Sequence, residues 1–281
     1  MAKLTGHRYG KARVRVLKIL RDGPVHTLKD VEVAAYLQGI FESSYTSGDN
    51  TKVVPTDTIK NTIHVFARQH LGEEIERFAV ILGEHFLSRY DQVNEAEIQI
   101  LERNWHRLTV DGAPHPHAFQ AGGEVRMFTH VVCSNAVKTI RSGVRDLVIL
   151  KSTGSGFENY SKDELTTLAE TNDRILATSF SATWNFEKQP DHYGRANEAI
   201  LDAMLKVFAN NYSPSAQTTL FQMGEAALAA CREISQLDLA MPNKHCLLIN
   251  LAPFGLENNN EVFVPTDEPH GDIRATVMRD E

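Results

Sequence analysis

Residues 9–37 read YGKARVRVLKIL, then RDGP, then VHTLKDVEVAAYL. In the first run Val14 and Val16 alternate with arginines, which is the period of two expected of a strand with one buried face. The stretch 21–24 combines Asp, Gly and Pro and predicts a turn. The run after it is rich in Val, Thr and Tyr, which favour strands. Residues 9–37 therefore predict a β-hairpin with strands over 9–20 and 25–37.

Outward from this hairpin, the rest of the first half shows helical and then strand patterns. Residues 43–50 form a polar loop. Ile59, Ile63 and Phe66 mark one apolar helical stripe, and residues 75, 78, 82 and 86 mark a second. Strand patterns follow over 98–110, which ends at Asp-Gly, and over 123–133. The order predicted for the first half is strand, strand, helix, helix, strand, strand.

The second half resembles that order with almost no shared identity. Strand patterns over 137–150 and 174–186 precede two helical patterns, one around 196–207 and one that starts near Ser215. Ser161 and Glu164 fit a capping box and predict a short helix between the two strands. Further strands are expected near 245–251, 261–264 and 273–277. An architectural repeat of half the chain predicts an α+β protein with units over 1–135 and 136–281.

Composition places the chain among ordinary globular proteins and excludes some partners. It has 281 residues, 23% of them charged, and a formal net charge of −7, with a pI near 6.0. A mildly acidic chain has no global attraction for nucleic acid or anionic lipid, so neither is an expected partner. No apolar run approaches the roughly 18 residues of a membrane span.

Cysteine usage and the chain ends indicate a compartment. The three cysteines, Cys133, Cys231 and Cys246, are odd in number and far apart. They predict buried, inert thiols in a reducing compartment rather than a disulfide framework. The first ten residues carry no signal-peptide pattern, and the last three are not the Ser-Lys-Leu peroxisomal address. We therefore expect a cytoplasmic protein of bacterial origin.

The familiar cofactor and metal motifs are absent. Gly154 and Gly156 form a GxG, but the third glycine of a dinucleotide loop is missing, so they predict a turn. There is no P-loop, no HExxH and no GxSxG. His115 and His117 have a spacing that could suit two metal ligands. They fall in a predicted hairpin loop without an obvious third ligand, which favours exposed loop histidines and no metal site.

One parallel links the two halves. In each half a proline precedes a short polar stretch and then a helix, in Pro55-Thr56-Asp57 and in Pro214-Ser215-Ala216-Gln217. Polar side chains at a helix start usually cap the helix. Alternatively, two helix N-termini present N–H groups and polar side chains to an anionic or amide-rich ligand. The pattern leaves both interpretations open, and capping is the commoner of the two.

Six local stretches occur in a familiar order and spacing over nearly the whole chain. They are YGK at 9–11, TDTIKNT at 56–62, LKSTGSGF at 150–157, DRILAT at 173–178, SPSAQTT at 213–219 and PNKH at 242–245. Any one of them alone is weak. Together they are highly specific, and the chain resembles the urate oxidase (uricase) family.

This resemblance implies a fold, an assembly and a reaction. The fold would be two tandem T-fold units, each an antiparallel four-stranded sheet with two helices packed on one face. The assembly would be a homotetramer with active sites at the subunit interfaces. The reaction would be oxidation of urate by dioxygen and water to 5-hydroxyisourate and hydrogen peroxide, in urate degradation, without a metal or organic cofactor.

The resemblance also implies catalytic roles. Lys11 would act with Thr56 as a base on urate, through a water, and His245 would relay protons to solvent. A lysine has an ordinary pKa near 10.4, so it must be desolvated or placed near another cation to accept a proton at neutral pH. Taken singly, Lys11 would be a solvated surface lysine and His245 a structural residue at a strand start.

Substrate binding is implied for a larger set. Arg174 would clamp a carbonyl and the adjacent ring nitrogen, and Gln217 would match an N–H beside a C=O. Phe157 would stack on the purine ring. The rest of the set is Thr56 and Asp57 at the other end of the purine, Ala216 through its backbone N–H, and Asn243 holding oxygen and then water above the ring. Taken singly, each has a structural alternative as a cap, an ion pair, a core aromatic or a turn residue.

Two other functions fit the same fold. A zinc-dependent pterin enzyme of the T-fold class would need a His or Cys cluster, and the sequence offers no convincing one. A catalytically inactive purine-binding scaffold would keep Arg174 and Gln217 but lose Lys11 or Thr56, and both are present.

Overall fold

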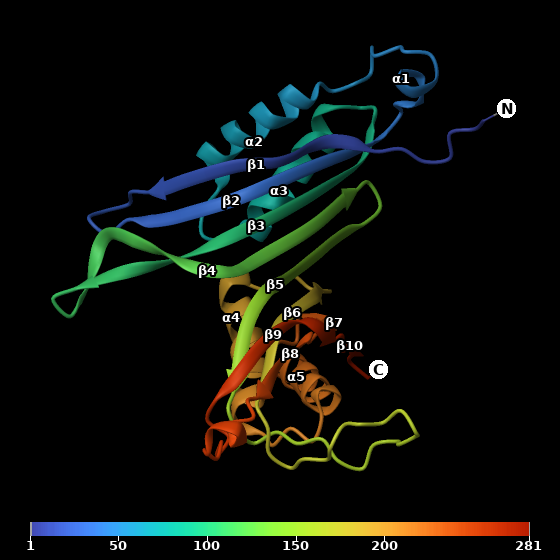
Figure 1. Cartoon of the computed structure of the whole chain (residues 1–281). Coiled ribbons are helices and arrows are strands. Elements are labelled where there is room, and N and C mark those ends of the chain that lie inside the picture. Colours follow the sequence, from blue (N-terminus) through green and yellow to red (C-terminus); the bar gives the residue numbers. More distant parts are fainter. Residues whose placement is uncertain (1, 281) are drawn as a thin grey trace. The chain divides into compact units, whose positions relative to one another are not determined.

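A computed structural model describes residues 2–280 of the chain. It consists of two compact units, each combining strands with two long helices (Figure 1). One unit comprises the residues up to Gly143 together with Asn185–Arg195, and the other comprises Val144–Trp184 together with the residues from Ala196 onward. The α+β class is confirmed, whereas the repeat boundary after residue 135 stays a prediction.

The first unit is built on the predicted hairpin. Strands β1 (Tyr9–Leu20) and β2 (Thr27–Gly39) pair antiparallel, β2 pairs with β3 (Val93–Val110), and β3 pairs with β4 (Ala113–Ser134). The strand period is visible in β2, where every second residue is fully buried: Val31, Val33, Ala35 and Leu37. The hairpin prediction is therefore confirmed, and β3 and β4 begin earlier than the sequence pattern indicated.

Two helices cover one face of this sheet (Figure 1). They are α2 (Thr56–His70) and α3 (Ile75–Arg89), and they bury the predicted apolar stripes against the strands. A short α1 (Glu42–Thr46) precedes them. The prediction of a plain loop over 43–50 is thus wrong in part. The Ser44 and Thr46 hydroxyls donate to backbone carbonyls one turn earlier, which supports this single turn of helix.

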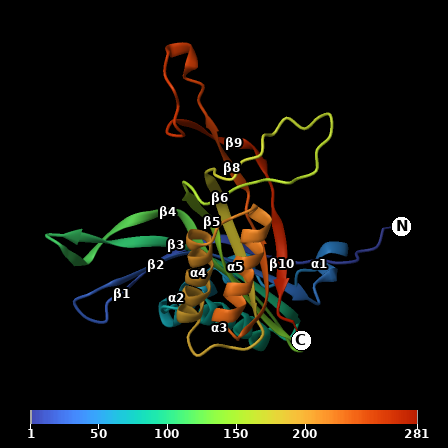
Figure 2. The ribbon, with the colours of Figure 1, turned by 90° about the horizontal axis from the view of Figure 1, so that it is seen from below.

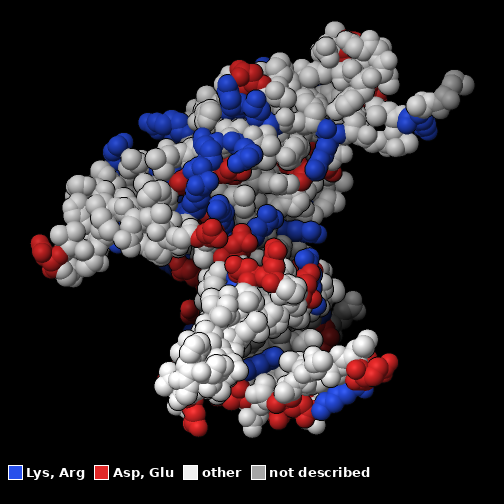
Figure 3. Space-filling view, viewed as in Figure 1, with Lys and Arg blue, Asp and Glu red and all other residues white. Residues whose placement is uncertain are grey.

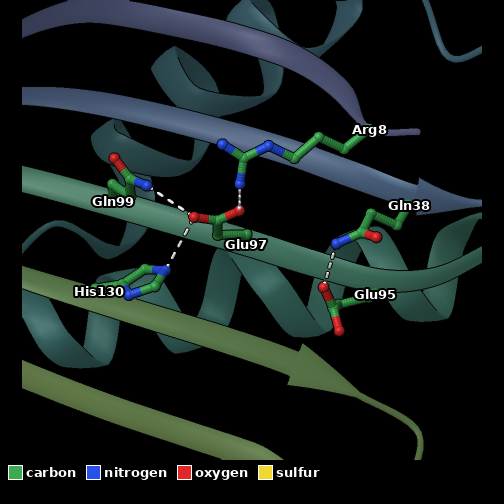
Figure 4. Close-up of polar contacts among 6 residues, drawn as sticks. All are labelled: Arg8, Gln38, Glu95, Glu97, Gln99 and His130. Atoms are coloured by element: carbon green, nitrogen blue, oxygen red, sulfur yellow. Dashed lines mark hydrogen bonds and ion pairs between the residues drawn. The ribbon is translucent and has the colours of Figure 1, made fainter. Parts of the chain in front are cut away.

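The opposite face of the same sheet is polar. Lysines and arginines gather over the strands of this unit (Figure 3). On β3, the nearly buried carboxylate of Glu97 accepts from the Arg8 guanidinium and from Gln99 Nε2 at 2.7 Å, and it lies 3.0 Å from His130 Nε2 (Figure 4). A carboxyl group shielded from water needs such hydrogen-bond partners, because an unpaired buried polar group is costly. This network anchors Arg8, immediately before β1.

The second unit repeats the arrangement, with α4 (Tyr193–Asn210) and α5 (Ala216–Ala230) on one face of its strands (Figure 2). The strand order is β5 (Lys138–Lys151), β6 (Leu176–Phe186), β7 (Ile234–Ala240) and β10 (Arg274–Met278). In addition, β8 (Asn243–Leu248) pairs with β6 and with β9 (Phe263–Gly271), and the short η1 (Ala252–Phe254) lies between β8 and β9 in the chain.

A glycine on the second helix of each unit shows the repeat that sequence identity hides. A Cβ added to Gly83 of α3 would lie 2.7 Å from the Cys133 sulfur on β4, and one added to Gly224 of α5 would lie 2.7 Å from Val277 on β10. In both units the second helix therefore approaches the last strand too closely for any side chain. The close packing of the second helix on its sheet therefore requires glycine at these two positions.

Two sequence predictions in the second unit need correction. The short helix at Ser161 and Glu164 is wrong, because residues 161–170 contain no helix. Asp163 Oδ1 instead accepts from the Leu165 N–H at 3.0 Å and from the Thr166 hydroxyl at 2.9 Å, which forms a local turn. Strand β7 was not predicted, although its sequence ISQLDLA alternates in the expected way.

The histidines and cysteines also differ in part from expectation. His115 and His117 lie in β4 rather than in a hairpin loop, with ring centroids 4.6 Å apart. All three cysteines are free, but Cys246 is only half-buried. Within residues 2–280, no three or more His, Cys, Asp or Glu side chains are grouped to hold a metal. Over the same residues, no helix has the length and apolar character needed to cross a membrane.

Candidate active site

The first set of candidate residues lies at the start of β1. The Val54 N–H donates to the Tyr9 hydroxyl at 2.7 Å, and the Tyr9 ring packs edge-on against Phe41 at 4.9 Å. Lys11 pairs with Ala35 of β2, and its side chain is half-buried. The register of β1 shifts just after Lys11. The chain at Lys11 is therefore held by aromatic packing and by a hydrogen bond to the segment that leads into α2.

Gly10 explains why a glycine precedes Lys11. A Cβ at this position would lie 1.9 Å from the Ala35 carbonyl oxygen and 2.7 Å from the Tyr36 Cα. No side chain fits between two backbones at that separation, so β1 and β2 approach this closely only through glycine. This close approach sets the position of the Lys11 backbone.

The start of α2 supplies Thr56 and Asp57, and neither of them caps the helix. The N-cap residue is Pro55, without a side-chain cap, and the Thr56 and Asp57 side chains are exposed. The Asp57 carboxylate bonds to Lys60 and to Asn61. Lys60 lowers the pKa of Asp57 most strongly, and the charge of Lys11 adds to this effect. The capping interpretation is thus wrong for α2, and Lys11 and Asp57 are electrostatic neighbours.

The second set begins with the loop 154–157 of the second unit. Gly154 has a φ of 73°, which favours glycine. The Gly156 N–H donates to the Ser213 carbonyl at 2.8 Å, and the Ser213 N–H donates to the Gly154 carbonyl at 2.9 Å. Phe157 exchanges two backbone hydrogen bonds with Thr171. The loop predicted as a turn is therefore fastened both to the segment before Arg174 and to the segment before α5.

These backbone bonds bring Phe157 and Arg174 together. The Arg174 N–H donates to the Ser155 carbonyl at 2.7 Å, and the guanidinium carbon lies 5.3 Å from the Phe157 ring centroid. Burial lowers the pKa of Arg174. Its Nε is buried without a protein partner. A buried donor without an acceptor beside an aromatic ring is suited to a flat ligand that carries carbonyl or anionic ring atoms.

The start of α5 resolves the two alternatives for its polar residues. Ser215 is the N-cap, and its hydroxyl accepts from the Thr218 N–H at 3.1 Å. Ala216 is buried, whereas the Gln217 side chain is exposed. The capping interpretation is therefore correct for Ser215 and leaves the Gln217 carboxamide available to a ligand.

Arg174, Asn243 and His245 line one pocket of about 240 Å³ in the second unit. Both Asn243 and His245 belong to β8, and the register of β8 with β9 shifts between them. The lining of this pocket includes neither Phe157 nor Gln217. Within the second unit the structure thus brings together Phe157 with Arg174, and Arg174 with the two β8 residues.

Comparisons with known proteins agree with this architecture. The family model described as Uricase matches residues 7–132 and 140–274. A uricase of Dictyostelium discoideum is 38% identical over 99% of this chain and 98% of its own length. The crystal structure of uricase from Arthrobacter globiformis superposes with a TM-score of 0.94 at 37% identity, covering 100% of this chain and 96% of that one. The chain belongs to the uricase family.

A more distant structure agrees in fold. A uricase from Bacillus fastidious superposes with a TM-score of 0.86 at 23% identity, covering 98% of this chain and 94% of that one. Fold similarity at this identity supports the T-fold architecture alone. The expected fold class, two tandem T-fold units, is confirmed.

Gly10→Ala tests the close approach beside Lys11. We expect this change to lower the free energy of unfolding by about 1–3 kcal/mol, because the new methyl group forces β1 away from β2. Gly6→Ala is the matched control, since a Cβ there meets nothing within 4 Å. Thermal unfolding followed by circular dichroism measures both variants. Equal melting temperatures for the two would mean that β1 and β2 are further apart at this point.

Proposed function

We propose that the two sets of side chains described above form the site at which this protein oxidises urate with dioxygen. The observation that supports this proposal most strongly is that the Arg174 guanidinium lies beside the Phe157 ring and that its buried Nε has no hydrogen-bond partner. The chain also matches the uricase family over nearly its whole length. Urate is flat and is a monoanion at neutral pH. It requires an aromatic face, a planar cation and amide-like donors and acceptors.

The second unit supplies those recognition groups. The Arg174 guanidinium donates two hydrogen bonds, one to a urate carbonyl oxygen and one to the neighbouring ring nitrogen. The exposed carboxamide of Gln217 and the backbone N–H of Ala216 match an N–H and a C=O on the far edge of the ring. Phe157 stacks on the purine face. Burial of Arg174 strengthens its interaction with the anion, because fewer waters compete.

The first unit supplies the base. Lys11 and Thr56 remove a second proton from bound urate through a water, and Asp57 holds the purine end at the start of α2. His245 passes the proton on to solvent.

The substrate carries the redox chemistry. The urate dianion gives electrons to dioxygen, and recombination forms a C5–O bond with a hydroperoxide, while Asn243 holds the oxygen above the ring. The C5–O bond then breaks with loss of hydrogen peroxide. Water adds at C5 and yields 5-hydroxyisourate. The protein provides position and proton transfer, and no metal or organic cofactor takes part.

The two sets belong to different copies of the chain in this proposal. Lys11, Thr56 and Asp57 of one copy meet Phe157, Arg174 and the β8 residues of a second copy, within a homotetramer. A closed symmetric assembly repeats the same contact at every subunit, so each tetramer has complete sites. Because all three cysteines are free thiols, we also propose that the enzyme works in a reducing compartment, the cytoplasm.

Loss of urate absorbance in the near ultraviolet tests the activity. We expect the purified protein to consume urate and dioxygen and to release hydrogen peroxide, with full activity after exhaustive chelation. Activity that disappears on chelation and returns with zinc would favour the metal-dependent pterin class instead. Urate binding without turnover would favour the inactive scaffold.

Lys11→Met tests the base. We expect turnover to fall by about 100-fold or more, with urate binding largely intact, since a positioned base contributes mainly to the transition state. Lys206→Met on the exposed face of α4 is the matched control and should leave turnover unchanged. Steady-state kinetics with urate measure both. Near-normal turnover of Lys11→Met would exclude Lys11 as the base.

Mixing two inactive variants tests the shared site. Lys11→Met and Arg174→Ala each damage one half of every site when expressed alone, and Arg174→Ala acts chiefly by weakening urate binding. When the two variants are co-expressed in equal amounts, their subunits pair at random. If two copies build each site, each half of a site is intact in about half of the cases, so about a quarter of the sites have both halves intact. We expect that fraction of wild-type activity at low urate concentration. No recovery above the two single variants would mean that one copy supplies both halves.

A further inference from the structure

A few buried polar atoms in the described chain have no hydrogen-bond partner, and Thr178 is one of two fully buried residues among those near the proposed site, Ser155 being the other. The atoms are His7 Nε2, Ser155 Oγ, Arg174 Nε, Thr178 Oγ1 and Asn185 Oδ1. Thr178 has no exposed surface at all. Buried hydroxyls are nearly always hydrogen-bonded, so the Thr178 hydroxyl is free to bond a polar side chain that comes within reach of it.

The sheet register identifies that partner. Thr178 of β6 pairs directly with Asn243 of β8. Directly opposed residues of an antiparallel pair project from the same face, with Cβ atoms about 4.5–5.5 Å apart. On its other side Asn243 pairs with Gly271, which has no side chain. Thr178 is therefore the directly paired residue whose side chain can orient the Asn243 carboxamide.

A carboxamide needs such an orienting group. Its oxygen and nitrogen ends are nearly the same size, so packing alone does not choose between the two flipped orientations. The oxygen species that forms above the purine gains negative charge as it accepts electrons, so it favours the N–H end of Asn243. The Oδ1 end must then accept a hydrogen bond from another donor. The Thr178 hydroxyl can be that donor, because it has no other hydrogen-bond partner.

We propose that Thr178 is a positioning residue, whose hydroxyl donates to Asn243 Oδ1 in the occupied site and turns the Nδ2–H toward the reacting oxygen. This inference rests on the proposed function of Asn243 in urate oxidation. Thr178 touches neither substrate nor oxygen itself. It acts through the carboxamide and changes the rate of the oxygen step more than the binding of urate.

Thr178→Val and Thr178→Ser, compared by steady-state kinetics with urate, separate orientation from packing. Valine keeps the shape and loses the hydroxyl, and we expect kcat to fall about tenfold with KM changed less than about twofold. Serine keeps the hydroxyl and should stay within about twofold of wild type in kcat. Thr183→Val is the matched control. Thr183 is five residues after Thr178 in β6, so its side chain lies on the opposite face of the strand, and its loss of a hydroxyl should not change kcat.

A double-mutant cycle with Asn243→Ala gives the second readout. If Thr178 acts only through Asn243, then Thr178→Val should have no further effect on kcat in the Asn243→Ala background. Should Thr178→Val fail to fold, Thr178→Ser and Thr178→Ala, which differ by one hydroxyl oxygen, provide the same comparison.

The outcomes are distinguishable. An active wild type with unchanged kcat in Thr178→Val, or an equal loss in Thr178→Ser, would overturn the positioning role while leaving the proposed function intact. Full additivity of Thr178→Val and Asn243→Ala would overturn it as well. A wild type that consumes no urate would overturn both the proposed function and this inference.

Discussion

The hydrogen bond from the Val54 N–H to the Tyr9 hydroxyl joins the two elements on which the first half of the proposed site depends. It ties the start of β1 to the segment that enters α2, across a gap of more than forty residues in sequence. Gly10 lets β1 lie against the backbone of β2, so this close approach and the Tyr9 hydrogen bond together fix the chain beside Lys11. The electrostatic influence of Lys11 on Asp57 follows from this arrangement.

The second half of the proposed site is built in a different way. Three segments far apart in the chain, around residues 155, 172 and 213, exchange backbone hydrogen bonds as short strands would. These hydrogen bonds hold the three loop segments together, and they position Phe157 and Arg174 next to the segment that leads into α5. Preorganised side chains lose little entropy when a ligand binds, which suits recognition of a small flat anion.

The two faces of the first sheet differ in character, one apolar and covered by helices and the other polar. One face packs apolar side chains under α2 and α3. The other holds ionised groups such as Glu97 among cations and amides, which keeps a carboxylate shielded from water without leaving it unpaired. That network also anchors Arg8, so the polar face contributes to the position of β1 as well.

Local patterns in the sequence were enough for the elements with a clear period. The β1–β2 hairpin and the stripes of α2 and α3 follow from short-range rules, because their burial repeats with the period of a strand or a helix. The sequence left capping as one of two interpretations at the starts of α2 and α5, and the structure shows a side-chain cap only at Ser215 of α5. The same rules failed at Ser161, where Asp163 satisfies the backbone in a turn instead of a helix. The candidate residues came from six matched stretches, since no single lysine, arginine or asparagine signals its role by itself.

Tertiary structure decided what depends on atoms distant in sequence. The need for glycine at positions 10, 83 and 224 comes from backbones and side chains that approach from other elements. The lack of a partner for Thr178, and its place opposite Asn243, are visible only once β6 and β8 pair. The sequence by itself determined the first hairpin, the apolar stripes of the two helices that follow it, and the family that the chain resembles. Packing between those segments decided which side chains meet, because contact distances and buried hydrogen bonds are properties of the folded chain and not of any stretch of it.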